Sequence, residues 1–175
     1  MSARRWLGGV AQRGFTLLEL MTVVAVVAVL AAVAAPSLKT FIDNQRLRNA
    51  SFDLVSDLLI ARSEALKRGG TTVVVITPTA TQSDGWSDGW SVNIGSSAGE
   101  VVTSRTGLAT QLRFAVQNSS NAPLGSLSVG SDGRVIGLSP IRIDVKYSVP
   151  PGGVTPSCIR IDATGRAKAD KGACS

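Results

Sequence analysis

RGFTLLELMTVVAVVAVLAAVAAP, residues 13–36, holds a single charged side chain, Glu19, after its opening arginine. From Phe15 to Ala35 the other residues are apolar apart from two threonines. At 1.5 Å per residue, a helix over this run is about 30 Å long, which matches the hydrocarbon thickness of a bilayer. The run therefore predicts a transmembrane helix over residues 15–36.

A cleaved secretory signal peptide is the alternative interpretation of this segment, with Ala32-Val33-Ala34 as the small-residue cleavage site. Such a signal usually has an apolar core of about 7 to 15 residues and no carboxylate near its start. The length of the run and Glu19 favour the membrane anchor. Its orientation is not fixed by charge, because basic residues precede and follow it in equal measure.

The order of residues around the start of the run is distinctive. Arg13-Gly14-Phe15-Thr16-Leu17-Leu18-Glu19-Leu20 resembles the class III signal of type IV pilins and type II secretion pseudopilins. The resemblance implies that residues 1–14 are a leader peptide. A prepilin peptidase would cut between Gly14 and Phe15 on the cytoplasmic face of the inner membrane and methylate Phe15. The helix would remain as a single-pass anchor with its N-terminus in the cytoplasm, and later pack against other pilins in a fibre.

Glu19 has a physical role in this scheme. A carboxylate in hydrocarbon costs a few kcal/mol even near a helix end, so it should lie near a cation. The new amine of Phe15 is four residues away on the same helix face, and the amine of a neighbouring subunit is the partner that the family implies for assembly. The simpler alternative is that Glu19 only stabilises the positive end of the helix dipole.

A second helical pattern follows Pro36, where a proline would kink the helix. Apolar residues recur at spacings of three and four, and we assign the charged residues, Asp57 among them, mostly to the other side. Glu64 and Arg68 form an i,i+4 pair, and Gly69-Gly70 ends the run. We expect an amphipathic scaffold helix over residues 37–70, with these residues against a core: Leu47, Ala50, Leu54, Leu58, Ala61 and Ala65.

From Thr71 the period changes to two, with breaks rich in Gly, Ser, Pro and Asn, which indicates short antiparallel strands over residues 71–175. Asp132-Gly133 favours a two-residue hairpin loop. The fold class is therefore α+β, a long kinked helix packed against antiparallel β-sheet, and the resemblance implies that the arrangement is pilin-like. We expect strands over residues 72–77, 90–94, 101–105, 111–116, 127–129, 134–137, 141–147 and 158–162.

Trp86 and Trp90 lie four residues apart and invite two interpretations. They could form a stacking platform for bases or sugars. Alternatively, Trp90 belongs to the inward face of a strand with Val92 and Ile94, while Trp86 covers the turn. We adopt the second interpretation.

Composition excludes most familiar catalytic and metal chemistry. The chain has 18 Lys+Arg against 12 Asp+Glu, no His and two Cys, so it lacks an imidazole base and the ligands of ordinary zinc sites. A hydrolase with a Ser and Lys pair is the remaining enzymatic alternative, but no motif places a nucleophile beside a base. The sequence predicts no catalytic residue, no metal site and no cofactor.

The two cysteines fall late in a domain that would be exported. A disulfide between Cys158 and Cys174 is the expected state, and it would fasten the C-terminal tail to the last strands. A reactive thiol is the alternative, although no obvious base accompanies either cysteine.

Basic residues gather inside the loop that this disulfide would close. Arg160 alternates with isoleucines along a strand, and Arg166 and Lys168 are two residues apart after the Thr164-Gly165 turn, with Lys171 nearby. This hairpin is the best candidate polyanion contact in the chain. A solvated hairpin that promotes solubility is the alternative.

The helix, the tryptophan-bearing strand and the cysteine-bounded hairpin together resemble the FimT/GspH branch of minor pilins over most of residues 14–174. Some members bind double-stranded DNA in natural transformation through Gly-Arg-x-Arg, which implies such a role for Arg166. Lys168 at the last position keeps the charge but lacks the bidentate fork. The resemblance implies a non-enzymatic minor pilin exposed in the periplasm or on the pilus. A GspH-like pseudopilin of a type II secretion system is the alternative.

Overall fold

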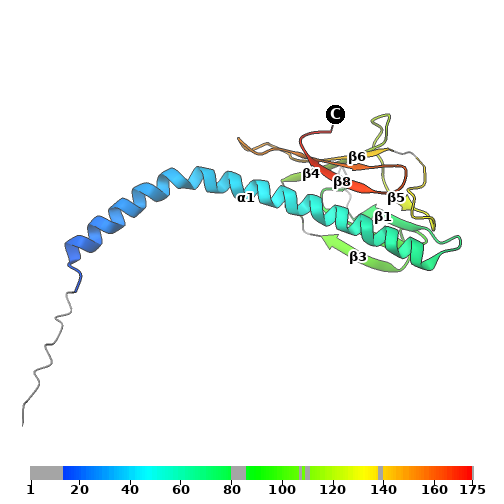
Figure 1. Ribbon diagram of the computed structural model, residues 1–175, viewed down its shortest axis with the longest axis horizontal. Coiled ribbons are helices and arrows are strands. Elements are labelled where there is room, and N and C mark those ends of the chain that lie inside the picture. The colour runs from blue at the N-terminus through cyan, green and yellow to red at the C-terminus, as the bar shows by residue number, and fades with distance from the viewer. Residues whose placement is uncertain (1–13, 80–85, 107, 109–110, 138–139, 175) are drawn as a thin grey trace, which may run out of the picture. The chain divides into compact units, whose positions relative to one another are not determined.

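The computed structural model describes residues 14–79, 86–106, 108, 111–137 and 140–174 (Figure 1). It divides the chain into two compact units, Met1–Leu38 and Lys39–Ser175. The predicted leader peptide, residues 1–14, lies outside the described residues except for Gly14.

One long helix, α1, covers Leu17–Arg68 and continues through Pro36. Its start is capped by Thr16, whose side-chain oxygen accepts a 3.1 Å hydrogen bond from the backbone N–H of Glu19. Threonine followed three residues later by glutamate is the sequence of a capping box. The helix ends as predicted, because Gly69 and Gly70 take φ angles of 60° and 62° that stop helical propagation.

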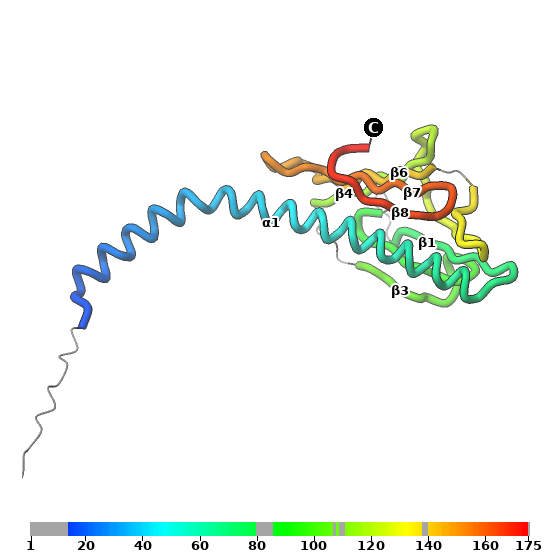
Figure 2. Tube along the Cα trace, viewed as in Figure 1, coloured from blue at the N-terminus to red at the C-terminus, as the bar shows by residue number. Residues whose placement is uncertain are grey.

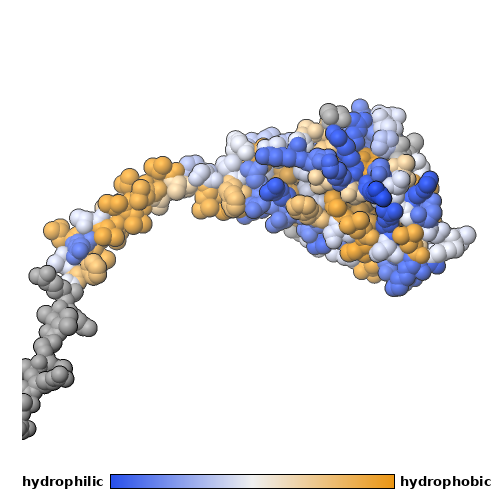
Figure 3. All heavy atoms as spheres, viewed as in Figure 1, coloured by the Kyte–Doolittle hydropathy of each residue, from blue (hydrophilic) through white to orange (hydrophobic). Residues whose placement is uncertain are grey.

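From Leu20 to Ala35, α1 has a single polar side chain, Thr22, and its large side chains are exposed. Figure 3 shows this hydrophobic surface on the face in view. An 18-residue stretch of this helix has a mean hydropathy of 2.6, and none of the stretch is buried. By length and composition it is able to cross a membrane.

The second half of α1 is amphipathic, and all six residues that the sequence assigns to its core face are buried (Leu47, Ala50, Leu54, Leu58, Ala61 and Ala65). They pack into one core with the apolar faces of two antiparallel sheets. Asp57, which the sequence pattern assigns to the polar side, is also fully buried, and Trp90 and Arg105 hold its carboxylate. That assignment is therefore wrong.

Two four-stranded sheets form the β domain, and Figures 1 and 2 show how their strands succeed one another along the chain. Sheet A has the order β3-β2-β1-β5 and sheet B the order β4-β6-β7-β8. Sheet A consists of β1 (Val74–Pro78), β2 (Gly89–Ile94), β3 (Val101–Thr106) and β5 (Leu127–Val129). Sheet B consists of β4 (Leu112–Gln117), β6 (Ile141–Tyr147), β7 (Ser157–Ile161) and β8 (Ala167–Lys171). The predicted α+β fold is confirmed.

The strand predicted over residues 134–137 is wrong. Val135 makes a single bridge to Val129, and the loop before it is longer than the predicted two residues. Gly130 N–H donates to the carbonyl of Arg134 at 2.8 Å, which leaves three residues in the loop with Gly133 at φ 73°. Arg134 closes this loop, so little chain remains to form a strand before Gly137 turns it at φ 96°.

Both tryptophans belong to the core. Trp90 is completely buried on β2 and Trp86 is 2% exposed, with its Nε1 donating to the carbonyl of Leu124 at 2.9 Å. A ring that is buried in this way cannot stack on a ligand, so the core interpretation of the pair is confirmed.

Candidate nucleic-acid interface

The candidate site is built on the hairpin of β7 and β8. These strands pair antiparallel, and the turn between them repeats the three-residue geometry of the loop at 130–134. Asp162 N–H donates to the carbonyl of Arg166 at 3.1 Å, and Gly165 takes φ 76°. The turn therefore fixes Arg166 at the end of the strand pair, where its backbone is hydrogen-bonded to Asp162.

Asp162 holds this turn through its side chain. Its Oδ1 accepts hydrogen bonds from the hydroxyl of Thr164 at 2.6 Å, the N–H of Thr164 at 2.8 Å and the N–H of Arg166 at 3.0 Å. The bond from the Thr164 hydroxyl and the backbone bond from Arg166 lower the pKa of Asp162, because they favour its charged form. Asp162 thus orders the turn and does not simply dilute the positive charge nearby.

The strand register brings three cations into one row across sheet B. Arg142 on β6 lies directly opposite Arg160 on β7, and Arg160 lies directly opposite Lys168 on β8. Residues that face one another across paired strands point to the same side of the sheet, and neighbouring strands are about 4.8 Å apart. We call Arg142, Arg160 and Lys168 the basic row.

Like charges directly opposite one another repel, so the side chains of the basic row need hydrogen-bond acceptors or carboxylates nearby. Arg142 reaches the carbonyl of Ser119 at 3.4 Å and the side-chain oxygen of Asn121 at 3.3 Å. The ammonium of Lys168 lies 2.8 Å from Asp170, but this side chain is 77% exposed, and an exposed ion pair contributes little.

The sequence analysis does not identify Arg142 as a site residue. Its grouping of Lys171 with Arg160 and Lys168 is wrong. The alternation in Ile141–Tyr147 shows that Arg142 faces outward, but only the strand register shows that it is opposite Arg160. Lys171 pairs with Ser157, one residue out of step with Asp170, so it lies on the other face of the sheet from the basic row.

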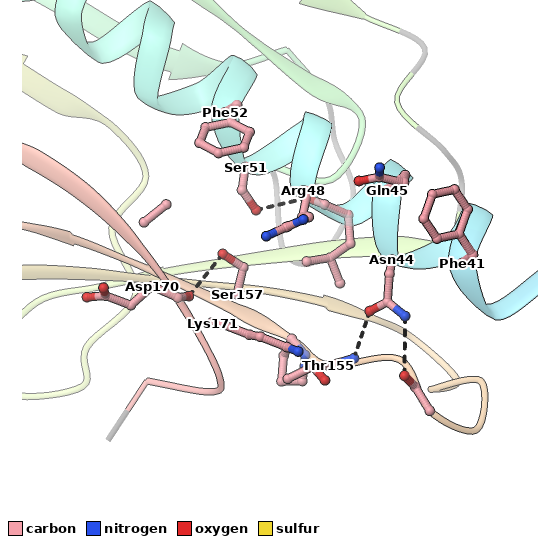
Figure 4. A pocket seen from close by; sticks show the side chains of 14 residues that line it. Phe41, Asn44, Gln45, Arg48, Ser51, Phe52, Thr155, Ser157, Asp170 and Lys171 are labelled. Atoms are coloured by element: carbon pink, nitrogen blue, oxygen red, sulfur yellow. Dashed lines mark hydrogen bonds between the residues drawn. The ribbon is translucent and has the colours of Figure 1, made fainter.

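Lys171 instead lines a groove beside α1 (Figure 4). One wall comes from α1, where Arg48 and the exposed ring of Phe52 lie, and the other from β8 and the segment before β7. Asn44 joins the walls, since its amide donates to the carbonyl of Gly153 at 3.2 Å and its oxygen accepts from Thr155 N–H at 3.2 Å.

The expected disulfide between Cys158 and Cys174 is present. It lies in the next row of the sheet, where Asp144 is opposite Cys158. Asp144 accepts a 2.7 Å hydrogen bond from Cys174 N–H, so the tail is fixed to the outer face of sheet B by a covalent bond and a charged acceptor. The basic row is the neighbouring row on the same face, and its Lys168 side chain is exposed.

The predicted processing residues lie at the start of the anchor. Phe15 is 84% exposed just before α1, and Glu19 is in the first turn of the helix. Among the residues that the structure describes, no cluster of three or more His, Cys, Asp or Glu side chains is placed to hold a metal.

Comparison with known proteins supports this architecture. The model of the family described as type II transport protein GspH matches residues 50–165, and the prokaryotic N-terminal methylation motif matches residues 10–35. No curated protein sequence gives a significant match.

Two solved structures share the fold. The type IV minor pilin FimU of Pseudomonas aeruginosa is 19% identical with a TM-score of 0.57, over 74% of this chain and 92% of that one. The minor pseudopilin EpsH from the type 2 secretion system of Vibrio cholerae is 14% identical with a TM-score of 0.51, over 72% of this chain and 97% of that one.

Proposed function

This chain belongs to the GspH family of minor pilins and pseudopilins, and from that premise we propose that it is a minor subunit of a type IV pilus. Two observations support the proposal: the methylation motif matches residues 10–35, and the helix that begins within this match, at Leu17, is long and apolar enough to cross a membrane. The prepilin peptidase cuts after Gly14 and methylates Phe15. The chain is anchored in the inner membrane with its N-terminus in the cytoplasm, and its β domain lies in the periplasm or on the pilus.

Mass spectrometry of the protein extracted from membranes tests the processing step. The mature chain is expected to begin with methylated Phe15. A chain that begins at Met1, or at Ala35 after signal-peptide cleavage, would contradict it.

Sheet B carries the second part of the proposal, which is that its outer face binds double-stranded DNA without catalysis. The observation that carries it is the register of Arg142, Arg160 and Lys168, three cations side by side on one face. Arg166 projects from the adjoining turn and extends the positive surface. Cations spaced along a face contact successive phosphates and give sequence-independent affinity with a strong salt dependence.

Binding of a fluorescein-labelled duplex to the processed full chain in detergent tests this face. Three or four phosphate contacts give a log-log salt slope of magnitude about 3. Replacing Arg160 and Lys168 by Gln is expected to weaken binding and lower the slope by about 2. Lys171→Gln is the matched control, because Lys171 belongs to the same hairpin but lies on the opposite face of sheet B. Equal binding by all three proteins would rule out this face.

The second candidate function is that of a minor pseudopilin in a type II secretion system. The fold shared with EpsH supports it as well as the fold shared with FimU supports a pilus role. Co-purification distinguishes the two, because a pseudopilin associates with secretion-system subunits and a pilin with pilus subunits.

A further inference from the structure

A second Gly-Arg turn lies against the turn that carries Arg166. Ser131-Asp132-Gly133-Arg134 and Ala163-Thr164-Gly165-Arg166 both form three-residue loops, with the glycine at positive φ and the arginine closing the loop. In Figure 2 the loop between β7 and β8 lies beside the segment that follows β5. The two turns belong to different parts of the chain and different sheets.

The contact between the turns is made by backbone. A Cβ atom on Gly165 would clash with the carbonyl oxygen of Gly133 and would lie 3.6 Å from the Cα of Arg134. Gly133 is buried, and a Cβ atom there would come within 3.1 Å of Nε of Arg62 and 3.2 Å of Leu66, both on α1. The turn at 131–134 is therefore held between α1 and the turn at 163–166.

This contact places two exposed arginines beside each other. Arg134 directly follows Gly133 and Arg166 directly follows Gly165, so their side chains start from adjoining backbone. The Arg134 side chain is 66% exposed, and its nearest carboxylate, Asp132, is 3.9 Å from its Nε. At that distance and exposure the pair contributes little, so the guanidinium remains able to bind another anion.

We infer that Arg134 and Arg166 together clamp a single phosphate of the DNA backbone. This inference rests on the proposed DNA binding and adds to it a residue from outside the hairpin. Two planar forks that start from adjoining backbone are close enough to reach one tetrahedral anion, and guanidinium matches phosphate oxygens with paired hydrogen bonds. The clamp extends the basic row onto the end of the other sheet.

The Asp132 and Asp162 carboxylates near the clamp accept hydrogen bonds from backbone N–H groups. Asp132 Oδ1 accepts a 3.0 Å hydrogen bond from the N–H of Arg134, and Asp162 Oδ1 accepts one from the N–H of Arg166. Each carboxylate thus fixes the backbone of the arginine that follows it in the turn, while the side chain of that arginine remains exposed.

Duplex binding by the processed full chain in detergent, measured at several salt concentrations, tests the clamp. Loss of one phosphate contact weakens binding about fivefold at roughly 0.15 M salt and lowers the salt slope by about 1. Arg134→Gln and Arg166→Gln are each expected to show part of this loss, because the other arginine still contacts the phosphate. The double variant is expected to show the loss of one phosphate contact and no more, because both arginines contact the same phosphate. Arg134→Lys, which keeps the charge without the fork, is expected to lie between wild type and Arg134→Gln.

Arg46→Gln is the control, since Arg46 is exposed on α1 about 24 Å along the helix from Arg62. It should bind DNA like the wild type. Wild-type binding by Arg134→Gln, alongside weakened Arg166→Gln, would overturn the clamp and leave the proposed function intact. A double variant whose salt slope falls by about 2 would also overturn it, because that fall indicates two separate phosphates. If the wild-type chain does not bind duplex at all, the proposed function itself fails.

Discussion

The indole Nε1 of Trp90 donates a 2.8 Å hydrogen bond to Oδ2 of Asp57, and neither residue has any exposed surface. Arg105 completes the arrangement from β3, with its Nε 3.0 Å from the same oxygen. A buried carboxylate is tolerated only when it is hydrogen-bonded and paired. The hydrogen bond that Arg105 donates to Asp57 also raises the pKa of Arg105. This network joins α1 to the middle and the edge of sheet A.

Replacing Asp57 by Ala should therefore destabilise the domain strongly. The change leaves the buried indole N–H of Trp90 without its acceptor and Arg105 without its closest carboxylate, which should lower the free energy of unfolding by about 2–4 kcal/mol. Asp53→Ala is the control, because Asp53 also pairs with Arg105, at 3.3 Å, but is 41% exposed. It should cost less than about 1 kcal/mol. Urea unfolding followed by tryptophan fluorescence measures both, and equal losses would contradict the role of burial.

The contact between the two Gly-Arg turns gives a second prediction. Gly165→Ala forces an L-residue into positive φ, which costs about 1–2 kcal/mol, and also pushes a methyl group into the carbonyl of Gly133. The clash should add about 1–3 kcal/mol. Gly95→Ala provides the comparison, because Gly95 has φ 79° but open space where its Cβ would be. Thermal unfolding measures the loss of stability in both variants. Gly95→Ala reports the backbone strain alone, and the additional loss in Gly165→Ala reports the clash. If Gly95→Ala is as destabilising as Gly165→Ala, the turns are not in contact.

The carboxylate of Asp162 should make the turn at 162–166 sensitive to acid. Because the pKa of Asp162 is lowered in the folded state, its contribution to stability is complete above the ordinary aspartate pKa of about 3.9. That contribution is lost as the pH falls through the lower pKa of the folded state. The amide NMR signals of Thr164 and Arg166 should accordingly shift together at a pH below the ordinary aspartate value.

Asp162→Asn is the control for this titration. The amide oxygen can still accept the backbone hydrogen bonds, but it does not titrate, so the two signals should stay in place over the same pH range. A shift that persists in Asp162→Asn would assign the titration to another group.

Glu19 provides a prediction for the anchor. If the new amine of Phe15 neutralises Glu19 during assembly, Glu19→Gln should be processed normally and yet enter few filaments, because the pairing charge is gone. Glu19→Asp, which keeps the charge on a shorter side chain, should recover part of the incorporation. Immunoblots of sheared filaments and of membranes measure both steps. Normal incorporation of Glu19→Gln would remove the assembly role and leave only the capping role at the helix start.

Local patterns in the sequence predict both halves of α1 and most strands, and the disulfide is expected because the two cysteines fall in a domain that would be exported. The heptad-like spacing from Leu47 to Ala65 repeats every turn, and Gly69-Gly70 ends it, so both signals are contained in a short stretch of chain. The hairpin of Cys158–Lys171 was visible for the same reason. The strand prediction over 134–137 is wrong because the length of the preceding loop, which depends on the hydrogen bond from Gly130 N–H to the carbonyl of Arg134, decides where pairing begins.

The site depends on pairing between distant segments, which local sequence patterns do not predict. Nothing near Arg142 indicates that it lies opposite Arg160, and nothing near Gly133 indicates that Gly165 packs on it. Asp57 looked like a surface residue because its partners, Trp90 and Arg105, come from β2 and β3. Each of these relationships is set by register or by tertiary contact, which a single sequence does not contain.

DNA uptake by living cells tests the central claim most directly. In a strain that lacks the gene, complementation with wild type should restore both transformation and twitching. Complementation with the variant Arg160→Gln/Lys168→Gln should restore twitching but leave transformation low, and Lys171→Gln should restore both. Full transformation with the doubly substituted chain would contradict the claim that this face of sheet B binds DNA.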